Sequence, residues 1–340
     1  MFSKKSILLV APEHVGFPSI IKKNLEYLGF EVLLFTTTSA DKFKYKSFFQ
    51  RVYNFWRKTF LRDKNFKRKL IIQHTENDLL NKLHAIKKVD YALFIRMDLF
   101  PLEFIKLAKT KCSKLTGYQW DGLDRYPEIA QYIPLMDRFF VFDSKDLAIS
   151  NTLPTTNFYF DCLEPIVPVR ENVAYYIGSY FEERIDTISD LNTKLATLNI
   201  ERNIKIASNR KRIIQLISSK GLTPMSDIET YEENLKGVFN ANILIDIQNP
   251  VHKGLSFRIF EGIGYNKKVI TTNPDIIHYD FYHPDNFLVW NGQTSQELAN
   301  FINSPYHTLE DSIKRKYSFT NWIAYMLDMP IDYSPIRLPN

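Results

Sequence analysis

The residues best suited to chemistry stand in one stretch, residues 249–273, which lies between two short apolar runs. The runs at 241–247 and 268–272 have the composition of buried strands. The loop between them enters a helix close to Gly254 and Ser256. The first turn of a helix presents free backbone N–H groups at the positive end of the helix dipole. This pattern favours a binding site for phosphate.

Charged side chains accompany this predicted phosphate site. Lys253 and Arg258 add positive charge beside the start of the helix, and Glu261 follows Arg258 by about one helical turn. A carboxylate can accept hydrogen bonds from both hydroxyls of a ribose. Phosphate donors followed by a carboxylate are what a nucleotide requires. The alternative is an ordinary crossover from strand to helix with a glutamate at the surface.

The same segment resembles the nucleotide-sugar loop of GT-B glycosyltransferases, in which a Gly-rich loop, a helix with a ribose-binding Glu and a strand such as KKVITTN follow one another. The resemblance assigns Glu261 to the ribose, and the backbone of Gly254, Leu255 and Ser256 to the diphosphate. Retaining members of the best-known family carry a second Glu eight positions before the first. Lys253 occupies that position here, so the stereochemical class stays open.

The length and composition of the chain limit the classes of protein to which it can belong. A chain of 340 residues with 45% hydrophobic residues can form two domains with real cores. Cys112 and Cys162 form neither a zinc spacing nor a disulfide framework, which indicates a reducing, cytoplasmic compartment. No apolar run reaches the length of ~18 residues that a membrane span needs. Glu13 and His14 interrupt the apolar start too early for a signal peptide.

The first half of the chain begins as a βαβ unit, with strands predicted at 6–11 and 30–35. In open α/β sheets, ligands bind beyond the carboxyl ends of the strands. Glu13, His14 and Gly16 follow the first strand, and we expect them in the active-site cleft, with Glu13 and His14 in catalysis and Gly16 at the donor. Alternatively, His14 only satisfies a backbone group of its loop.

Residues 41–69 interrupt the α/β pattern with eleven Lys or Arg residues, all within 42–69, against only Asp41 and Asp63. Phe49, Tyr53, Trp56 and Phe60 have spacings that place them on one helix face. A basic helix with an aromatic face can lie on an anionic membrane, so the segment predicts peripheral membrane contact. The alternatives are a helix packed on its own domain and a nucleic-acid surface. No nucleic-acid motif accompanies the segment, and we expect no nucleic-acid partner.

A strand is predicted at 89–95, and Arg96, Met97 and Asp98 stand at its carboxyl end. The later order YQWDGLDRYP and RFFVFDSKD is similar to the first domains of bacterial enzymes that build lipopolysaccharide and capsule glycans. That resemblance places Asp121 in the cleft as a catalytic carboxylate, with Asp124 and Arg125 close to it. The alternative is that Asp121 caps the following turn.

The prolines of residues 163–169 indicate a linker, and a strand at 174–180 opens the second domain. YYIGSYFEER resembles the start of the GT-B second domain, which assigns Gly178 and Arg184 to the nucleotide-sugar site. There the Gly gives the loop room and the Arg neutralises the donor phosphate. An arginine can bind phosphate through two parallel hydrogen bonds, which lysine cannot do. A surface ion pair of Arg184 with a neighbouring glutamate is the alternative.

We therefore predict an α/β protein of the GT-B type, with two doubly wound Rossmann-like domains facing a central cleft and a C-terminal helix that crosses back. The expected domains are 1–165 with an insertion at about 41–69, 166–317, and a returning helix and tail at 318–340.

The predicted activity is transfer of a sugar from a nucleotide-sugar donor to a glycan or lipid-linked glycan of the bacterial surface, at the inner face of the cytoplasmic membrane. The nucleotide-sugar is a substrate, so no cofactor is expected. No Asp-x-Asp pair stands at a strand end, so we expect no metal. The alternatives are a non-catalytic nucleotide- or glycan-binding protein and a sugar-nucleotide epimerase.

Overall fold

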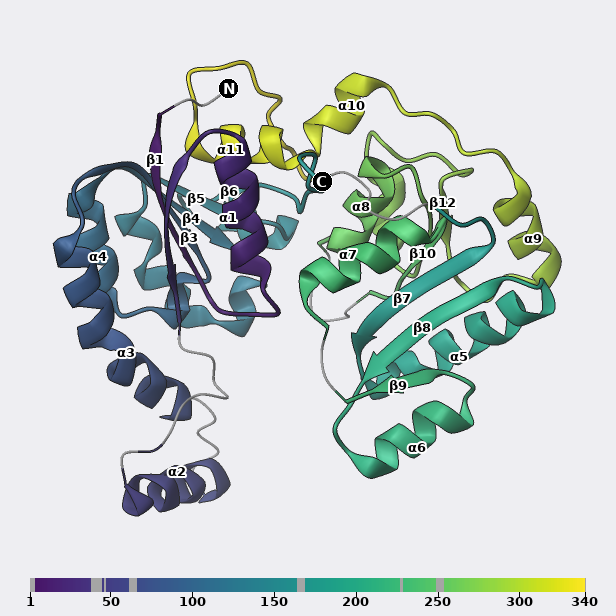
Figure 1. The fold of residues 1–340 in the computed structure, drawn as a ribbon, viewed down its shortest axis with the longest axis horizontal. Coiled ribbons are helices and arrows are strands. Elements are labelled where there is room, and N and C mark those ends of the chain that lie inside the picture. The colour runs from purple at the N-terminus through teal and green to yellow at the C-terminus, as the bar shows by residue number, and fades with distance from the viewer. Residues whose placement is uncertain are drawn as a thin grey trace. The chain divides into compact units, whose positions relative to one another are not determined.

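A computed structural model describes residues 4–37, 45, 47–60, 66–163, 169–226, 229–248 and 254–339, with the backbone alone at 60, 67–69, 71–75 and 77 (Figure 1). The chain forms two compact units. Unit 1 comprises Met1–Val141 and Asp146–Leu153, and unit 2 comprises Phe142–Lys145 and Pro154–Asn340. Most of the predicted linker lies outside the described residues.

Unit 1 is built on a six-stranded sheet in the order β2-β1-β3-β4-β5-β6, and the neighbours from β2 to β5 pair in parallel. Its strands are β1 (Ser6–Ala11), β2 (Glu31–Thr36), β3 (Val89–Ile95), β4 (Cys112–Gln119), β5 (Arg138–Val141) and β6 (Leu153–Pro154). Its helices are α1 (Phe17–Tyr27), α2 (Phe48–Phe60), α3 (Phe66–Ala85) and α4 (Leu102–Lys111). The chain leaves β1 for β2 on one side and returns to β3 on the other. The topological switch point of unit 1 therefore lies between β1 and β3.

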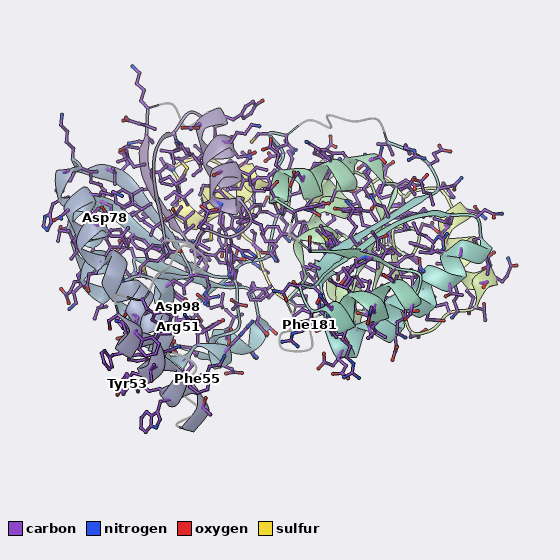
Figure 2. The ribbon with its side chains drawn as sticks, turned by 60° about the horizontal axis from the view of Figure 1, so that its bottom comes forward. Arg51, Tyr53, Phe55, Asp78, Asp98 and Phe181 are labelled. Carbon is purple, nitrogen blue, oxygen red and sulfur yellow. The ribbon has the colours of Figure 1, made fainter. Side chains whose placement is uncertain are left out.

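Helix α2 falls in the basic aromatic segment and differs from the other helices of unit 1. Its ring contact with α3 joins Tyr53 and Phe66, whose centroids are 5.2 Å apart. Tyr53 and Phe55 project from the helix in Figure 2, and both are exposed to solvent. The aromatic side of α2 therefore faces outward and is not packed as a core face.

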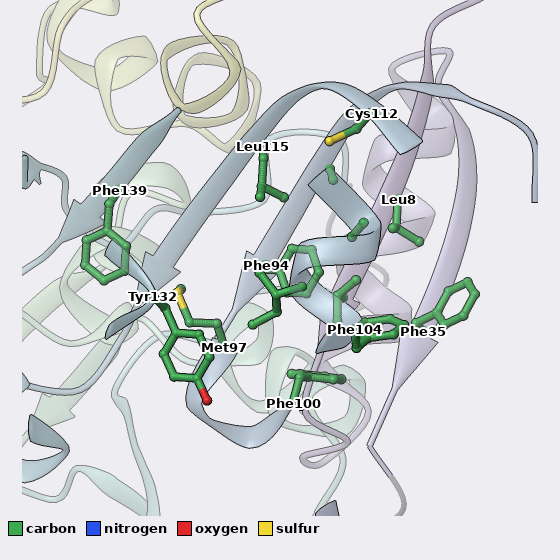
Figure 3. Close-up of a cluster of buried hydrophobic side chains, with 14 of the residues drawn as sticks. Leu8, Phe35, Phe94, Met97, Phe100, Phe104, Cys112, Leu115, Tyr132 and Phe139 are labelled. Atoms are coloured by element: carbon green, nitrogen blue, oxygen red, sulfur yellow. The ribbon is translucent and has the colours of Figure 1, made fainter. Parts of the chain in front are cut away.

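The core of unit 1 forms where α3 and α4 pack against the sheet (Figure 3). The central strand β3 has six of its seven residues buried, as expected for a parallel strand covered on both faces. Phe104 and Ala108 lie one turn apart on α4 and belong to the same buried cluster as Phe94 of β3, and the rings of Phe94 and Phe104 are 5.9 Å apart. This packing fixes the carboxyl ends of β1, β3 and β4 in one rigid edge.

Unit 2 is built on a second six-stranded parallel sheet, in the order β12-β11-β10-β7-β8-β9. Its strands are β7 (Val173–Ser179), β8 (Glu201–Ala207), β9 (Thr223–Met225), β10 (Ile243–Asp246), β11 (Lys268–Thr271) and β12 (Phe287–Val289). Its helices are α5 (Glu182–Thr197), α6 (Lys211–Ser219), α7 (Tyr231–Asn240), α8 (Phe257–Gly264), α9 (Ser295–Asn303), α10 (Asp311–Lys316) and α11 (Phe319–Leu327). Counted within the unit, the order is 6-5-4-1-2-3, which is the Rossmann order. Its switch point lies between β7 and β10.

The chain thus contains two successive Rossmann-like units, which confirms the predicted α/β fold class and is the domain content of the GT-B fold. The central cleft and the return of the last helix to the first domain stay predictions. Helix α11 is almost wholly buried, and within unit 2 the ring of Trp322 lies 4.4 Å from that of Phe158.

Both cysteines are free, with Cys112 buried and Cys162 half-buried. Burial raises the pKa of each thiol to about 12. Among the described residues, no helix combines the length and the apolar character needed to cross a bilayer.

Candidate functional site

The switch point of unit 2 brings together the carboxyl ends of β7 and β10 and the start of α8. Asp246, the last residue of β10, is buried and connects these elements. Its Oδ1 accepts a hydrogen bond of 2.7 Å from Ser256 Oγ, and its Oδ2 accepts one of 2.8 Å from Thr271 Oγ1. Ser256 is the N-cap of α8 and makes no side-chain cap bond to the helix, because its hydroxyl is directed to Asp246. Asp246 therefore fixes the start of α8 to the carboxyl ends of β10 and β11.

Arg258 lies in the first turn of α8 and is also directed to the switch point. Its Nη2 donates to the carbonyl of Ile177 in β7, and its Nη1 lies 3.7 Å from Asp246 Oδ1. Its guanidinium lies over the Tyr176 ring, 4.9 Å from the centroid. The Nε of Arg258 is buried and has no hydrogen-bond partner among the described residues. The side chain thus holds a positive charge at the end of β7, with one donor unused.

Arg184 stands in the first turn of α5, which begins at Glu182. Two glutamates in that first turn favour the start of a helix at this point through the helix dipole. The guanidinium of Arg184 lies 4.5 Å from the centre of the Phe181 ring, and its Nε has no hydrogen-bond partner among the described residues. A second arginine therefore follows β7, on the other side of the switch point from β10.

Glu261 is 1% exposed and lies inside α8, one turn beyond Arg258. Its Oε1 accepts a hydrogen bond of 2.7 Å from the hydroxyl of Tyr231 at the start of α7. Its Oε2 is buried without a hydrogen-bond partner among the described residues. Burial raises the pKa of Glu261, and the Tyr231 hydrogen bond and the Arg258 charge oppose that rise. Glu261 is thus a buried carboxyl group with one oxygen left to accept.

Gly254 and Gly178, the two glycines of the predicted donor site in unit 2, are closely packed against aromatic side chains. A Cβ on Gly254 would lie 2.1 Å from the Phe142 ring, so no larger residue fits there. A Cβ on Gly178 would approach the Tyr176 hydroxyl at 2.7 Å, which a rotation of that side chain could relieve. Leu255 is buried, and its carbonyl oxygen accepts a hydrogen bond of 2.9 Å from Asn157 Nδ2. Lys253 lies outside the described residues.

A cavity of about 150 Å³ opens beside Gly254, within unit 2. Its polar lining comes from Ser144, Asp275 and His278, and the chain at Leu338 closes part of its wall. The start of α8 therefore adjoins a space that a small polar molecule can enter.

The switch point of unit 1 carries His14, which follows β1 in a loop of unusual backbone. Val15 and Gly16 both take the left-handed conformation, with φ of 45° and 74°, and Gly16 is the N-cap of α1. Such a conformation is uncommon for a β-branched residue such as Val15. Glu13 and His14 both keep exposed surface. The protein atoms around the His14 imidazole remove part of its hydration and lower its pKa, and the Asp121 carboxylate opposes that shift.

Arg96 joins the ends of β3 and β4 through two carboxylates. It is buried and takes the left-handed conformation at φ 55° and ψ 59°. Its guanidinium makes two bonds of 2.9 Å to Asp98 and a third to Asp121 Oδ2, and it lies 4.0 Å from the Tyr126 ring centre. Burial lowers the pKa of Arg96, but Asp98 and Asp121 outweigh this effect and the net pKa is raised.

Asp121 is therefore held by arginines and does not simply cap a turn. Besides Arg96, the Nη1 of Arg125 lies 3.3 Å from its Oδ1. Asp124, named with it from the sequence, follows in the short 3-10 helix Leu123–Arg125. The structure adds Arg96 and Asp98 to the residues assigned from the sequence. The available signal was the Arg-Met-Asp triplet at the carboxyl end of a buried strand.

Metal ligands are a further requirement of many transfer sites. Within the ranges that the structure describes, no three His, Cys, Asp or Glu residues come together in a way that could hold a metal ion.

No family model matches this sequence, and neither does any curated protein. Solved structures are similar at low identity. The UDP-GlcNAc 2-epimerase of Methanocaldococcus jannaschii, solved with UDP-GlcNAc and UDP, is 12% identical over 89% of this chain and 94% of its own, with a TM-score of 0.45. A glycosyltransferase from Rickettsia africae is 13% identical over 89% and 88%, with a TM-score of 0.44.

MurG of Acinetobacter baumannii is 13% identical over 78% of each chain, with a TM-score of 0.35. A chain of a GtfA/B complex is 12% identical over 68% of this chain, with a TM-score of 0.38, and this chain spans about half (52%) of its length. These values are too low for the likeness to assign an activity, a substrate or a site residue.

Proposed function

We propose that this protein is a glycosyltransferase that uses a nucleotide-sugar donor. The observation that carries the proposal is the buried Glu261, whose Oε2 has no hydrogen-bond partner among the described residues, one helical turn from Arg258 at the switch point of unit 2. A buried carboxyl group costs folding free energy unless its hydrogen-bonding capacity is used. The ribose of a bound nucleotide would supply the missing donor.

Unit 2 takes the donor in this proposal. The diphosphate lies at the start of α8, where backbone N–H groups and the helix dipole favour negative charge. Arg258 and Arg184 carry the positive charge that stabilises the diphosphate as it leaves, and each has an Nε without a hydrogen-bond partner in the described part of the chain. These side chains take the place of a metal ion, and the reaction needs no cofactor.

Unit 1 supplies the acceptor side. An acceptor hydroxyl oxygen forms the new bond to the anomeric carbon, and the bond from that carbon to the phosphate oxygen breaks with its electron pair. His14 takes the hydroxyl proton, because its lowered pKa keeps the imidazole neutral near pH 7. Both oxygens of Asp121 are engaged by arginines, so its role is to favour the imidazolium electrostatically.

We propose that the acceptor is a glycan or lipid-linked glycan of a bacterial surface polysaccharide, made at the cytoplasmic face of the membrane. The support is the similarity of the sequence around Asp121 to such enzymes, together with the basic aromatic segment.

The test begins with a panel of nucleoside diphosphates and nucleotide-sugars in a thermal-shift assay. A donor at ~100 times its Kd should stabilise the protein by about 2.7 kcal/mol. Glu261→Ala should weaken binding of that donor by roughly 1.5–3 kcal/mol in calorimetry, since a hydrogen bond to a charged group is lost. Glu171→Gln, at an exposed glutamate of the same unit, is the control.

Product analysis then separates the functions. Sugar appearing on a glycan acceptor supports transfer. Conversion of the donor to an epimer without acceptor would identify an epimerase. Donor binding without any turnover would leave a nucleotide-binding protein, and unchanged donor affinity in Glu261→Ala would remove the assignment of Glu261.

A further inference from the structure

Helix α2 exposes a continuous set of large apolar side chains. They are Phe48, Phe49, Val52, Tyr53, Phe55 and Trp56, here called the apolar arc, with exposed fractions from 44% at Trp56 to 82% at Phe49. At 3.6 residues per turn these positions share one side of the helix, and Gln50, Asn54 and Arg57 occupy the other. The polar side is half-buried while the apolar arc is exposed. This is the reverse of the orientation of a surface helix in a globular protein.

The polar side has partners that hold α2 in this orientation. Asn54 Nδ2 donates a hydrogen bond of 2.9 Å to the hydroxyl of Tyr45, and the guanidinium of Arg57 lies 4.8 Å from the centre of the Phe66 ring. These contacts join α2 to the preceding segment and to the first residue of α3. The apolar arc is therefore directed outward by specific contacts of the opposite side.

The charge around the arc restricts what can cover it. Helix α2 contains no acidic residue, and Arg51 and Lys58 are exposed beside the arc. Residues 42–69 contain eleven basic residues and one acidic residue, so the net charge of this segment, 11 − 1 = +10, exceeds the net charge of +6 of the whole chain. The rest of the chain is therefore net acidic, and the positive charge of the sequence is concentrated in residues 42–69, the segment that contains α2.

We propose that α2 lies in the surface of an anionic lipid bilayer, parallel to it, with the apolar arc at the boundary between headgroups and acyl chains. The apolar arc can be buried at the boundary between headgroups and acyl chains, and the basic residues beside it are attracted to the anionic headgroups. A second copy of this chain would bring like charges together, and a nucleic acid would match the charge but not the aliphatic and phenyl surface. The inference extends the proposed function but does not depend on it.

The experiment is flotation of the full chain with vesicles of phosphatidylcholine alone or with roughly 30% phosphatidylglycerol, a level of anionic lipid that gives a negative surface potential. We expect binding to the anionic vesicles and little to the neutral ones. Raising the salt from ~0.1 M to ~1 M shortens the Debye length from ~10 Å to ~3 Å and should release most of the bound protein. Equal binding to both vesicles, or binding to neither, would overturn the proposal.

Paired variants test the two components separately. Phe55→Ser removes apolar surface at 65% exposure, and Tyr27→Ser on α1, at 64%, is its matched control. Arg51→Glu with Lys58→Glu reverses charge beside the arc, and Lys87→Glu with Lys88→Glu makes the same change of charge elsewhere in unit 1. Arg57 is left intact because it contacts Phe66. The α2 variants should reduce vesicle binding at least tenfold, and the controls should keep it; equal losses in both would overturn the proposal.

Trp56 reports the depth of the arc. Of the other three tryptophans, Trp290 and Trp322 are buried and Trp120 is half-buried. The exposed Trp56 should therefore dominate a blue shift on adding anionic vesicles, and Trp56→Phe should abolish that shift. A dimer in sedimentation that Phe55→Ser dissociates, without vesicle binding, would reassign the arc to self-association. Loss of single-stranded DNA binding in the same variants, again without vesicle binding, would reassign it to nucleic acid. Nucleotide binding by unit 2 should be unchanged in every α2 variant. If the wild-type protein binds no nucleotide, that result contradicts the proposed function and leaves this inference unaffected.

Discussion

The hydroxyl of Tyr231 donates a hydrogen bond of 2.7 Å to Oε1 of Glu261, and this bond joins the start of α7 to the middle of α8. It occupies one oxygen of a carboxyl group that is otherwise surrounded by protein. Burial raises the pKa of both partners. The ionised form of Glu261 is therefore disfavoured in the folded protein, which is the condition expected of a group retained for a ligand.

Replacing Glu261 by Gln should separate stability from binding. The amide oxygen can still accept from Tyr231, but no charge is buried, so we expect the variant to be at least as stable as the wild type at pH 8. A raised pKa means that the native wild type binds more protons than the unfolded chain above about pH 4.5, so wild-type stability falls as pH rises through the raised value. The advantage of Glu261→Gln should therefore shrink toward pH 4.5. Urea unfolding at several pH values measures it, and a variant that is less stable than wild type at pH 8 would contradict the account.

Arg184→Ala and Arg258→Ala should each lower kcat by about 10²–10³-fold, the usual effect of losing one group that stabilises developing charge. Arg258→Ala should also lower stability, because Arg258 connects α8 to Ile177 of β7 and lies near Asp246. Arg184 has no such connection in the described residues beyond the Phe181 ring. Arg202→Ala, an exposed arginine at the opposite end of the sheet, is the control. Wild-type kcat in both site variants at saturating donor would place the phosphates elsewhere.

His14→Gln should lower kcat by about 10²–10⁴-fold if His14 is the general base. Because partial burial lowers its pKa below 6.5, the wild-type rate should fall only on the acid side of that value. The Asp121 carboxylate favours the imidazolium, so Asp121→Asn should move the acid limb to lower pH. The measurement is a pH–rate profile, with His84→Gln on α3 as the control. An acid limb that stays in place in Asp121→Asn would argue against their coupling.

Arg96→Ala should destabilise unit 1 by about 3–5 kcal/mol, because it removes the guanidinium that pairs with the fully buried carboxylate of Asp98. The exposed pair of Lys82 and Asp78 is a matched contrast, since its side chains are 62% and 66% exposed and Lys82→Ala should cost less than ~1 kcal/mol. Denaturant unfolding gives both values. A cost for Arg96→Ala as small as that for Lys82→Ala would show that the cluster is not structurally coupled.

Parallel strands were the most predictable part of the fold. The predicted strands at 6–11 and 89–95 have the bounds of β1 and β3, because a strand buried on both faces is a continuous apolar run. The start of α8 after Ser256 was predictable for a related reason, since glycine and serine mark the end of a loop.

The arrangement of charges within the site was not predictable from local pattern. Arg96 reaches Asp121 across 25 residues, and Tyr231 reaches Glu261 across 30. Both contacts depend on which strands are neighbours in the sheet. The sequence of α2 likewise shows that the helix has two sides, but only Asn54 and Arg57 in their packed positions show that the aromatic side faces outward.

The raised pKa values of the two native thiols have a practical consequence for spectroscopy. Maleimides and similar reagents attack the thiolate, and a pKa of about 12 leaves almost none of it at Cys112 or Cys162 near pH 7.5. A cysteine introduced at an exposed position such as Thr59 should therefore be labelled selectively in the otherwise natural chain. A spin label or fluorophore could then follow α2 directly, without first replacing either native cysteine.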